Sequence, residues 1–104
     1  MKEVTVQELK SMIDQNEEFQ LIDVRETFEY EVSNLNGINI PLGGILIESD
    51  KISKDIPVIM QCRSGKRSAQ AVMLLEQQGF TNLANLKGGI LAWKEEINPE
   101  MDVY

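Results

Sequence analysis

The pattern of apolar and polar residues switches between helical and strand spacing along the whole chain. Leu9, Met12 and Ile13 recur at helical spacing, and Thr5 precedes Glu8 by three residues in a capping-box pattern. Short apolar runs separate the helical segments, and Pro or Gly residues end several of them. The pattern predicts helices over residues 6–14, 26–31, 68–78 and 90–97, one helical turn near 45–48, and strands over 19–24, 38–40, 57–61 and 83–86.

This alternation of strands and helices predicts the fold class. We expect an α/β protein with a parallel sheet of about five short strands and helices on both faces, which is a three-layer α/β/α architecture. Residues 57–61 are the candidate central strand, because a buried parallel strand is apolar on both faces. A chain of 104 residues can build one hydrophobic core but not two, so we expect a single domain over residues 1–104.

Composition and charge exclude several classes of function. Hydrophobic residues make up 42% and charged residues 26% of the chain, as is ordinary for a globular protein. The net charge of -7 argues against nucleic-acid binding, which needs a basic face. The apolar runs are too short to cross a bilayer, so no membrane partner is expected. The first residues lack the apolar core of a signal peptide, and one cysteine cannot form an internal disulfide, which together favour a cytoplasmic location.

The only cysteine, Cys62, follows the candidate central strand and opens a polar loop before the next helix. The other residues of this loop are Arg63, Ser64, Gly65, Lys66, Arg67 and Ser68. We expect the loop amides to point into one bowl, closed by the helix N-terminus, of the kind that holds anions. A thiol at the rim of such a bowl is stabilised as the reactive thiolate. Cys62 is therefore the candidate nucleophile, and the loop is the candidate binding site for an anionic substrate.

Three observations narrow the chemistry of this loop. A lone cysteine after an apolar strand is usually an inert core residue, but six polar, basic or glycine residues follow this one. Arg63, Lys66 and Arg67 would oppose the dipole of the following helix, so their clustering is unfavourable unless an anion binds there. The chain has no histidine, which excludes a Cys–His pair and makes a zinc site improbable. Activation of the thiol must then come from dipoles and cations.

Three further motifs have structural explanations. Asp23 and Arg25 stand at a strand end and could line the site, but we favour Asp23 as the cap of the following helix and Arg25 as the partner of a nearby carboxylate. Gly88 and Gly89 are expected to form a tight turn, and Trp93 to anchor the core.

Together these motifs resemble the rhodanese family, specifically its small single-domain members. The four matching segments follow the family's order and span nearly the whole chain: residues 21–26, 39–42, 62–68 and 86–93. The resemblance implies sulfurtransfer, in which Cys62 takes sulfane sulfur from an anionic donor such as thiosulfate, forms a persulfide and passes it to cyanide or a thiol. It implies no cofactor beyond the covalent persulfide, and it makes a sulfur-carrier protein a further candidate partner.

The chain also departs from the family's pattern, and two alternatives stay open. Ser33, Asn34 and Leu35 replace the usual Gly-His-Ile, and we expect Asn34 to supply part of the lost hydrogen bonding. A cysteine-dependent phosphatase or arsenate reductase is less favoured, because such phosphatases have an arginine six positions after the cysteine, where this chain has Ser68. A non-catalytic binding module or a sulfur relay that works with a partner protein is the second alternative.

Overall fold

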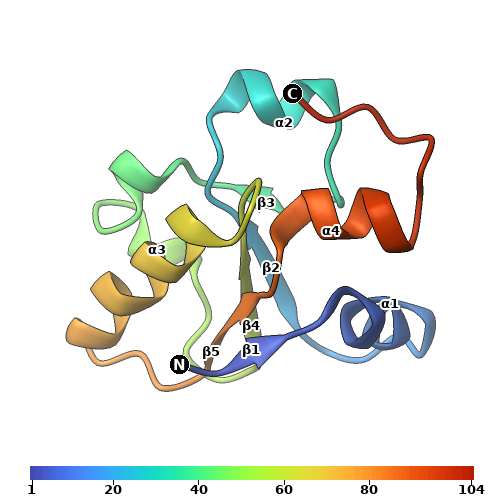
Figure 1. Ribbon diagram of the computed structural model, residues 1–104. Coiled ribbons are helices and arrows are strands. Elements are labelled where there is room, and N and C mark those ends of the chain that lie inside the picture. Colours follow the sequence, from blue (N-terminus) through green and yellow to red (C-terminus); the bar gives the residue numbers. More distant parts are fainter.

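The computed structural model describes residues 1–104 as a five-stranded parallel sheet with four α-helices around it (Figure 1). The strands lie in the order β1-β5-β4-β2-β3, so that β4 is central. Their bounds are Glu3–Val4 for β1, Gln20–Asp23 for β2, Ile38–Asn39 for β3, Val58–Gln61 for β4 and Leu83–Leu86 for β5. The helices are α1 (Val6–Asp14), α2 (Thr27–Val32), α3 (Lys66–Gln77) and α4 (Gly89–Glu96). The predicted fold class is confirmed.

The strict alternation of side chains along the central strands divides the core into two clusters. Leu21, Ile59 and Ala84 stand side by side in the register and contribute to one cluster with α1 and α4. Ile22 and Met60 point to the opposite face and form the other cluster with α3. Figure 1 shows α3 on one side of the sheet and α1 and α4 on the other. Helices thus cover both faces, as the apolar strands require.

Several predicted boundaries need correction. Helix α3 begins at Lys66, two residues earlier than predicted, because Gly65 adopts a left-handed conformation (φ 101°) and serves as its N-cap. The turn predicted near 45–48 is present, with the Glu48 amide donating to the Gly44 carbonyl at 2.9 Å, and two short 3-10 helices that were not predicted flank it, η1 (Leu42–Gly44) and η2 (Ser49–Lys51). The edge strand β1 was not predicted, since two residues are too few to show a pattern.

Two local predictions about helix starts and turns are confirmed. The Thr5 hydroxyl accepts the Glu8 amide at 3.1 Å, and the Glu8 carboxylate accepts the Thr5 amide at 2.9 Å, which completes the capping box of α1. Gly88 and Gly89 form a tight turn with φ angles of 79° and 60°. A Cβ on Gly89 would lie 2.5 Å from the carbonyl oxygens of both Cys62 and Arg63. Only glycine therefore lets this turn pack against the segment that follows β4.

The carboxyl ends of the parallel strands all lie at one edge of the sheet, and α2 lies beyond this edge (Figure 1). Cys62 directly follows β4 there, as expected for a reactive group in an open parallel sheet. The amides of Ile90 and Leu91, at the start of α4, donate to the carbonyls of Cys62 and Arg63 at 2.9 and 3.1 Å. The backbone at Cys62 is thus held by the α4 side of the molecule. No helix has the length and apolar character needed to cross a membrane.

Candidate active site

Cys62 lies at the base of its loop, with only 1% of its surface exposed. This corrects the prediction that the thiol stands at the rim. Cys62 continues the alternation of Val58 and Met60, so its side chain points toward α3 and joins the core cluster that contains Val72. Its sulfur nevertheless meets polar groups, because the Gly65 amide donates a hydrogen bond to Sγ at 3.1 Å. Cys62 is therefore both a core residue and a sulfur held by the loop.

Ser68, which is itself hydrogen-bonded to Asn85, makes a second polar contact with this sulfur. The Ser68 Oγ lies 3.3 Å from Cys62 Sγ and 2.5 Å from Asn85 Oδ1. The Asn85 Nδ2 donates to the Gly65 carbonyl at 3.0 Å, which turns Oδ1 toward Ser68. Both side chains are buried. Asn85 thus ties the loop at Gly65 to the first turn of α3 at Ser68, with the Cys62 sulfur between these two contacts.

Asn85 was not among the predicted site residues. It stands in β5 between Met60 of β4 and Glu3 of the edge strand β1. One signal in the sequence could have found it, because an asparagine inside a four-residue buried strand needs hydrogen-bond partners. The sequence alone does not say that these partners are Gly65 and Ser68.

The three cations of the loop have different surroundings. Arg63 is exposed and donates from Nε to the main-chain oxygen of Tyr104 at 2.6 Å. Lys66 is exposed and makes no ion pair, and Ser64 is exposed as well. Arg67 is half-buried, and its Nη1 and Nη2 donate to the two Glu29 carboxylate oxygens at 2.7 and 2.9 Å. Only Arg67 is held in a fixed ion pair.

The ion pair shifts the titration of both partners. Hydrogen bonds from Arg67 lower the pKa of Glu29, against the opposing effect of burial. The same hydrogen bonds raise the pKa of Arg67, and the nearby charges of Glu29 and of the Cys62 thiolate add smaller contributions. Glu29 was another residue that the sequence analysis missed. A glutamate on a short helix gives no signal of a partner 38 residues away.

Asp23 and Arg25 form a buried ion pair beneath α2. Arg25 donates from Nη2 to Asp23 Oδ2 at 2.8 Å and from Nε to Asp23 Oδ1 at 3.0 Å, so the prediction that Arg25 pairs with a nearby carboxylate is confirmed. The prediction that Asp23 caps α2 is wrong, because Arg25 occupies its carboxylate and α2 begins after Glu26. Arg25 also donates to the carbonyl of Ser33 at 2.8 Å and thus fixes the end of α2, the helix that carries Glu29.

The hydrogen bonds of Asn34 and the packing of Trp93 agree with the predictions. The Asn34 amide donates to the Tyr30 carbonyl at 3.1 Å and accepts the Asn36 amide at 2.9 Å, so it both donates and accepts as expected. Trp93 is partly buried and packs against the core cluster on the α1 and α4 side.

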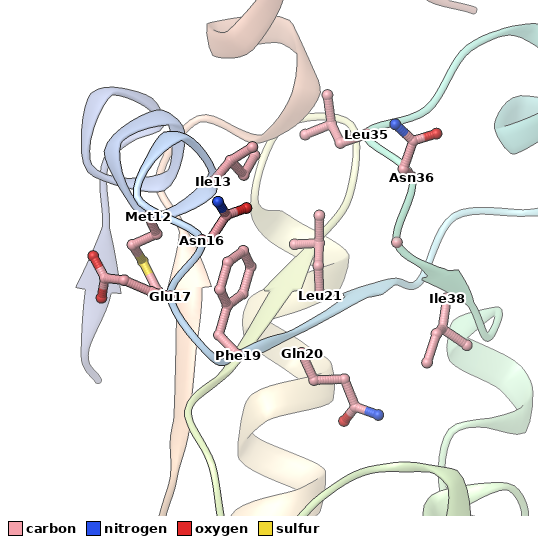
Figure 2. A pocket seen from close by; sticks show the side chains of 11 residues that line it. Met12, Ile13, Asn16, Glu17, Phe19, Gln20, Leu21, Leu35, Asn36 and Ile38 are labelled. Atoms are coloured by element: carbon pink, nitrogen blue, oxygen red, sulfur yellow. The ribbon is translucent and has the colours of Figure 1, made fainter.

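One open groove lies away from Cys62. It has a volume of about 510 Å³ and lies between α1, the start of β2 and β3 (Figure 2). None of the Cys62 loop residues lines it, and its walls include Met12, Phe19, Leu21 and Leu35. No three His, Cys, Asp or Glu side chains come together as metal ligands. Cys62 itself lies away from this groove, beside the N-terminus of the twelve-residue helix α3.

Comparison with known proteins identifies the type of domain. A family model described as "Rhodanese-like domain" matches residues 5–96. A protein of Allochromatium vinosum named "Sulfurtransferase" is 35% identical over 94 residues, which cover 89% of this chain and 88% of that protein. A protein of Mycobacterium tuberculosis named "Probable adenylyltransferase/sulfurtransferase MoeZ" is 29% identical over 104 residues, which are 97% of this chain. The match spans only about a quarter (26%) of the length of MoeZ.

A solved structure agrees with the family model. The crystal structure of a rhodanese-like domain protein from Staphylococcus aureus superimposes with a TM-score of 0.85 at 30% identity. The superposition covers 100% of this chain and 99% of that one. The similarity therefore extends over the whole fold, including the loop after β4.

Proposed function

Because the chain belongs to the rhodanese-like domain family, we propose that it transfers sulfane sulfur through a persulfide on Cys62. Cys62 is the only cysteine, and no histidine is present to act as a base. The reaction must therefore begin from a thiolate that the loop itself stabilises. The named relatives support a sulfurtransferase, and the donor and acceptor are part of our proposal.

The proposed reaction has two steps. The Cys62 thiolate attacks the outer sulfur of a donor such as thiosulfate, so that an S–S bond forms on Cys62 while the S–S bond of thiosulfate breaks and sulfite leaves. An acceptor, cyanide or a thiolate, then attacks the outer sulfur of the persulfide and releases the Cys62 thiolate. Thiocyanate or a new persulfide is the product. Each step moves one sulfur atom and needs no oxidant, reductant or separate cofactor.

The observation that carries this proposal is the Gly65 amide that donates to Cys62 Sγ at 3.1 Å, at the N-terminus of α3. The amides of the first helical turn have no acceptor within the helix, so they favour negative charge at this point. The same groups can stabilise the thiolate before the first step and the terminal sulfur of the persulfide after it.

The test is mass spectrometry of the intact protein after incubation with thiosulfate. We expect a gain of one sulfur atom on Cys62 and its removal by cyanide, with release of thiocyanate. The Cys62→Ala variant should keep its circular dichroism spectrum and gain no sulfur. Thiocyanate production by this variant, or sulfur found on another residue, would contradict the mechanism.

A relay role is the second candidate. The nearly complete burial of Cys62 favours donors and acceptors that present a narrow sulfur group, as a partner protein can do with an extended segment. MoeZ, as named, carries an adenylyltransferase beside its sulfurtransferase, which fits a domain that hands sulfur to another component. A protein that accepts sulfur on Cys62 but releases it only slowly to cyanide and small thiols would support the relay.

The geometry does not favour a phosphatase. The sixth position after Cys62 is Ser68, which is buried against Asn85, and the nearest arginine is bound to Glu29. The chain therefore has no arginine at the sixth position, and the adjacent Arg67 has its fork bound to Glu29 rather than free to bind a phosphoryl group.

A further inference from the structure

Glu29 reaches from α2 to Arg67, the cation of the Cys62 loop that is held in an ion pair. Its carboxylate accepts two hydrogen bonds from the Arg67 guanidinium, at 2.7 and 2.9 Å, and its side chain is only 6% exposed. The same carboxylate also accepts the Glu26 amide at 3.1 Å, at the start of α2. The carboxylate is therefore fixed in position, and because little water surrounds it, its charge is only weakly screened.

The cations of the loop differ in how strongly they affect the Cys62 sulfur. Arg63 and Lys66 are exposed, so water and salt screen their effect on a buried sulfur. Arg67 is half-buried and near enough to Cys62 for the thiolate to affect its titration. Glu29 compensates this one weakly screened positive charge. With this charge compensated, the groups that contact the Cys62 sulfur are the neutral Gly65 amide and Ser68 hydroxyl, which suit one negative charge better than two.

We infer that Glu29, by pairing with Arg67, limits the positive charge of the Cys62 loop and so selects a sulfur donor of low charge over a dianion. This inference rests on the proposed sulfurtransferase function and specifies its donor class. Thiosulfate carries two negative charges, whereas the persulfide of a thiol, R–S–SH, is neutral or carries one. With such a donor the Cys62 thiolate attacks the outer sulfur, an S–S bond forms on Cys62, and the donor's S–S bond breaks to release R–S⁻.

The Glu29→Gln substitution tests the charge while keeping most of the geometry. A glutamine oxygen can still accept the Glu26 amide and Arg67 Nη1. Its Nε2, however, would face Arg67 Nη2, so that two donors oppose each other and the bidentate pair is lost. The substitution removes one negative charge and frees the guanidinium, while the start of α2 keeps its hydrogen bond.

The experiment compares alkylation of Cys62 by two reagents of similar size and the same chemistry. Iodoacetamide is neutral and iodoacetate is an anion at neutral pH, so the ratio of their rates reports the local charge and cancels the effect of burial. We expect Glu29→Gln to raise the iodoacetate to iodoacetamide ratio by about three- to tenfold. Arg67→Gln should lower it by a similar factor, and the double variant should return close to the wild-type ratio.

Glu31→Gln is the matched control, because Glu31 lies exposed on the same helix and makes no ion pair. Equal ratios in Glu29→Gln and Glu31→Gln would overturn the inference. If Glu29→Gln failed to fold, an Arg67→Gln ratio at or above the wild-type value would overturn it instead. Alkylation needs no sulfur transfer, so this result stands apart from the proposed function.

Steady-state kinetics test the donor class itself. With thiosulfate as donor, Glu29→Gln should lower KM several-fold and leave kcat nearly unchanged, because the freed charge acts on donor binding. With an alkyl persulfide as donor, which carries at most one negative charge, KM should stay within about twofold of the wild-type value. An unchanged KM for thiosulfate would overturn the assignment of the donor. Absence of any sulfur on wild-type Cys62, with either donor, would instead refute the proposed function.

Discussion

The hydroxyl group of Ser68 has a single hydrogen but two neighbours that can accept it. Asn85 Oδ1 lies at 2.5 Å and Cys62 Sγ at 3.3 Å, and the donation of Asn85 Nδ2 to Gly65 leaves Oδ1 free to accept. In the resting site the shorter contact takes the hydrogen. Asn85 thus determines how Ser68 contacts the Cys62 sulfur, and through the Gly65 carbonyl it also holds the residue whose amide donates to that sulfur.

Asn85→Asp should slow the alkylation of Cys62 by iodoacetamide about tenfold. A carboxylate cannot donate to the Gly65 carbonyl, and it places a negative charge one hydroxyl group away from the sulfur, so both effects oppose the thiolate. The measurement is the alkylation rate of folded protein at neutral pH, followed by mass spectrometry.

Asn82→Asp is the control for this prediction. Asn82 precedes β5, and its Nδ2 donates to the carbonyls of Ser53 and Ile56, far along the strand from Cys62. The control should lose about 1 kcal/mol or more of stability and keep its alkylation rate. An equal loss of rate in both variants would mean that Asn85 acts only through stability.

At the scale of elements, the loop after β4 is shaped by the starts of two helices. Helix α3 begins at Lys66, and the amide of its N-cap, Gly65, donates to Cys62 Sγ, while the start of α4 binds the carbonyls of Cys62 and Arg63. The turn at Gly88 and Gly89 brings α4 against this backbone. The position of Cys62 therefore depends on a close approach of two segments about 25 residues apart, which glycine alone permits.

Gly89→Ala should destabilise the protein by about 2–4 kcal/mol, because its Cβ would lie 2.5 Å from two backbone oxygens and its φ is +60°. Gly43→Ala is the control, since a Cβ there meets nothing within 4 Å and its φ is not positive. The control should change the free energy of unfolding by less than about 1 kcal/mol. Urea unfolding measures both, and equal effects would show that the close packing at Gly89 is relaxed in solution.

At the scale of the whole molecule, the two core clusters share the same strands. Ile59 of β4 faces one cluster and the adjacent Met60 faces the other. Loss of either helical layer would expose one face of the sheet to water, which apolar parallel strands cannot tolerate. The two layers are therefore expected to unfold together.

Leu9→Ala on α1 and Leu75→Ala on α3 test this cooperativity, because both side chains are fully buried, one in each cluster. Each should lower the free energy of unfolding by about 2–5 kcal/mol. Trp93 fluorescence reports the α4 side, and far-ultraviolet circular dichroism reports all helices. In Leu75→Ala the two midpoints should coincide. Separate midpoints would mean that the layers unfold independently.

The sequence by itself determined the α/β class, the parallel sheet, the capping box at Thr5 and the position of Cys62 between a buried strand and a helix. These features depend on neighbouring residues, whose spacing and chemistry are visible in the printed chain. The resemblance of four short motifs then pointed to the family.

Only the tertiary structure decided which groups surround the Cys62 sulfur. Arg67 meets Glu29 from 38 residues away and Ser68 meets Asn85 from 17 residues away, and neither pair leaves a periodic signal. The burial of Cys62 and the two-residue strand β1 likewise depend on how α3 and β5 pack against β4 and β1. Such contacts follow from the folding of distant segments onto one sheet, so local patterns predict the nucleophile but not its charge environment.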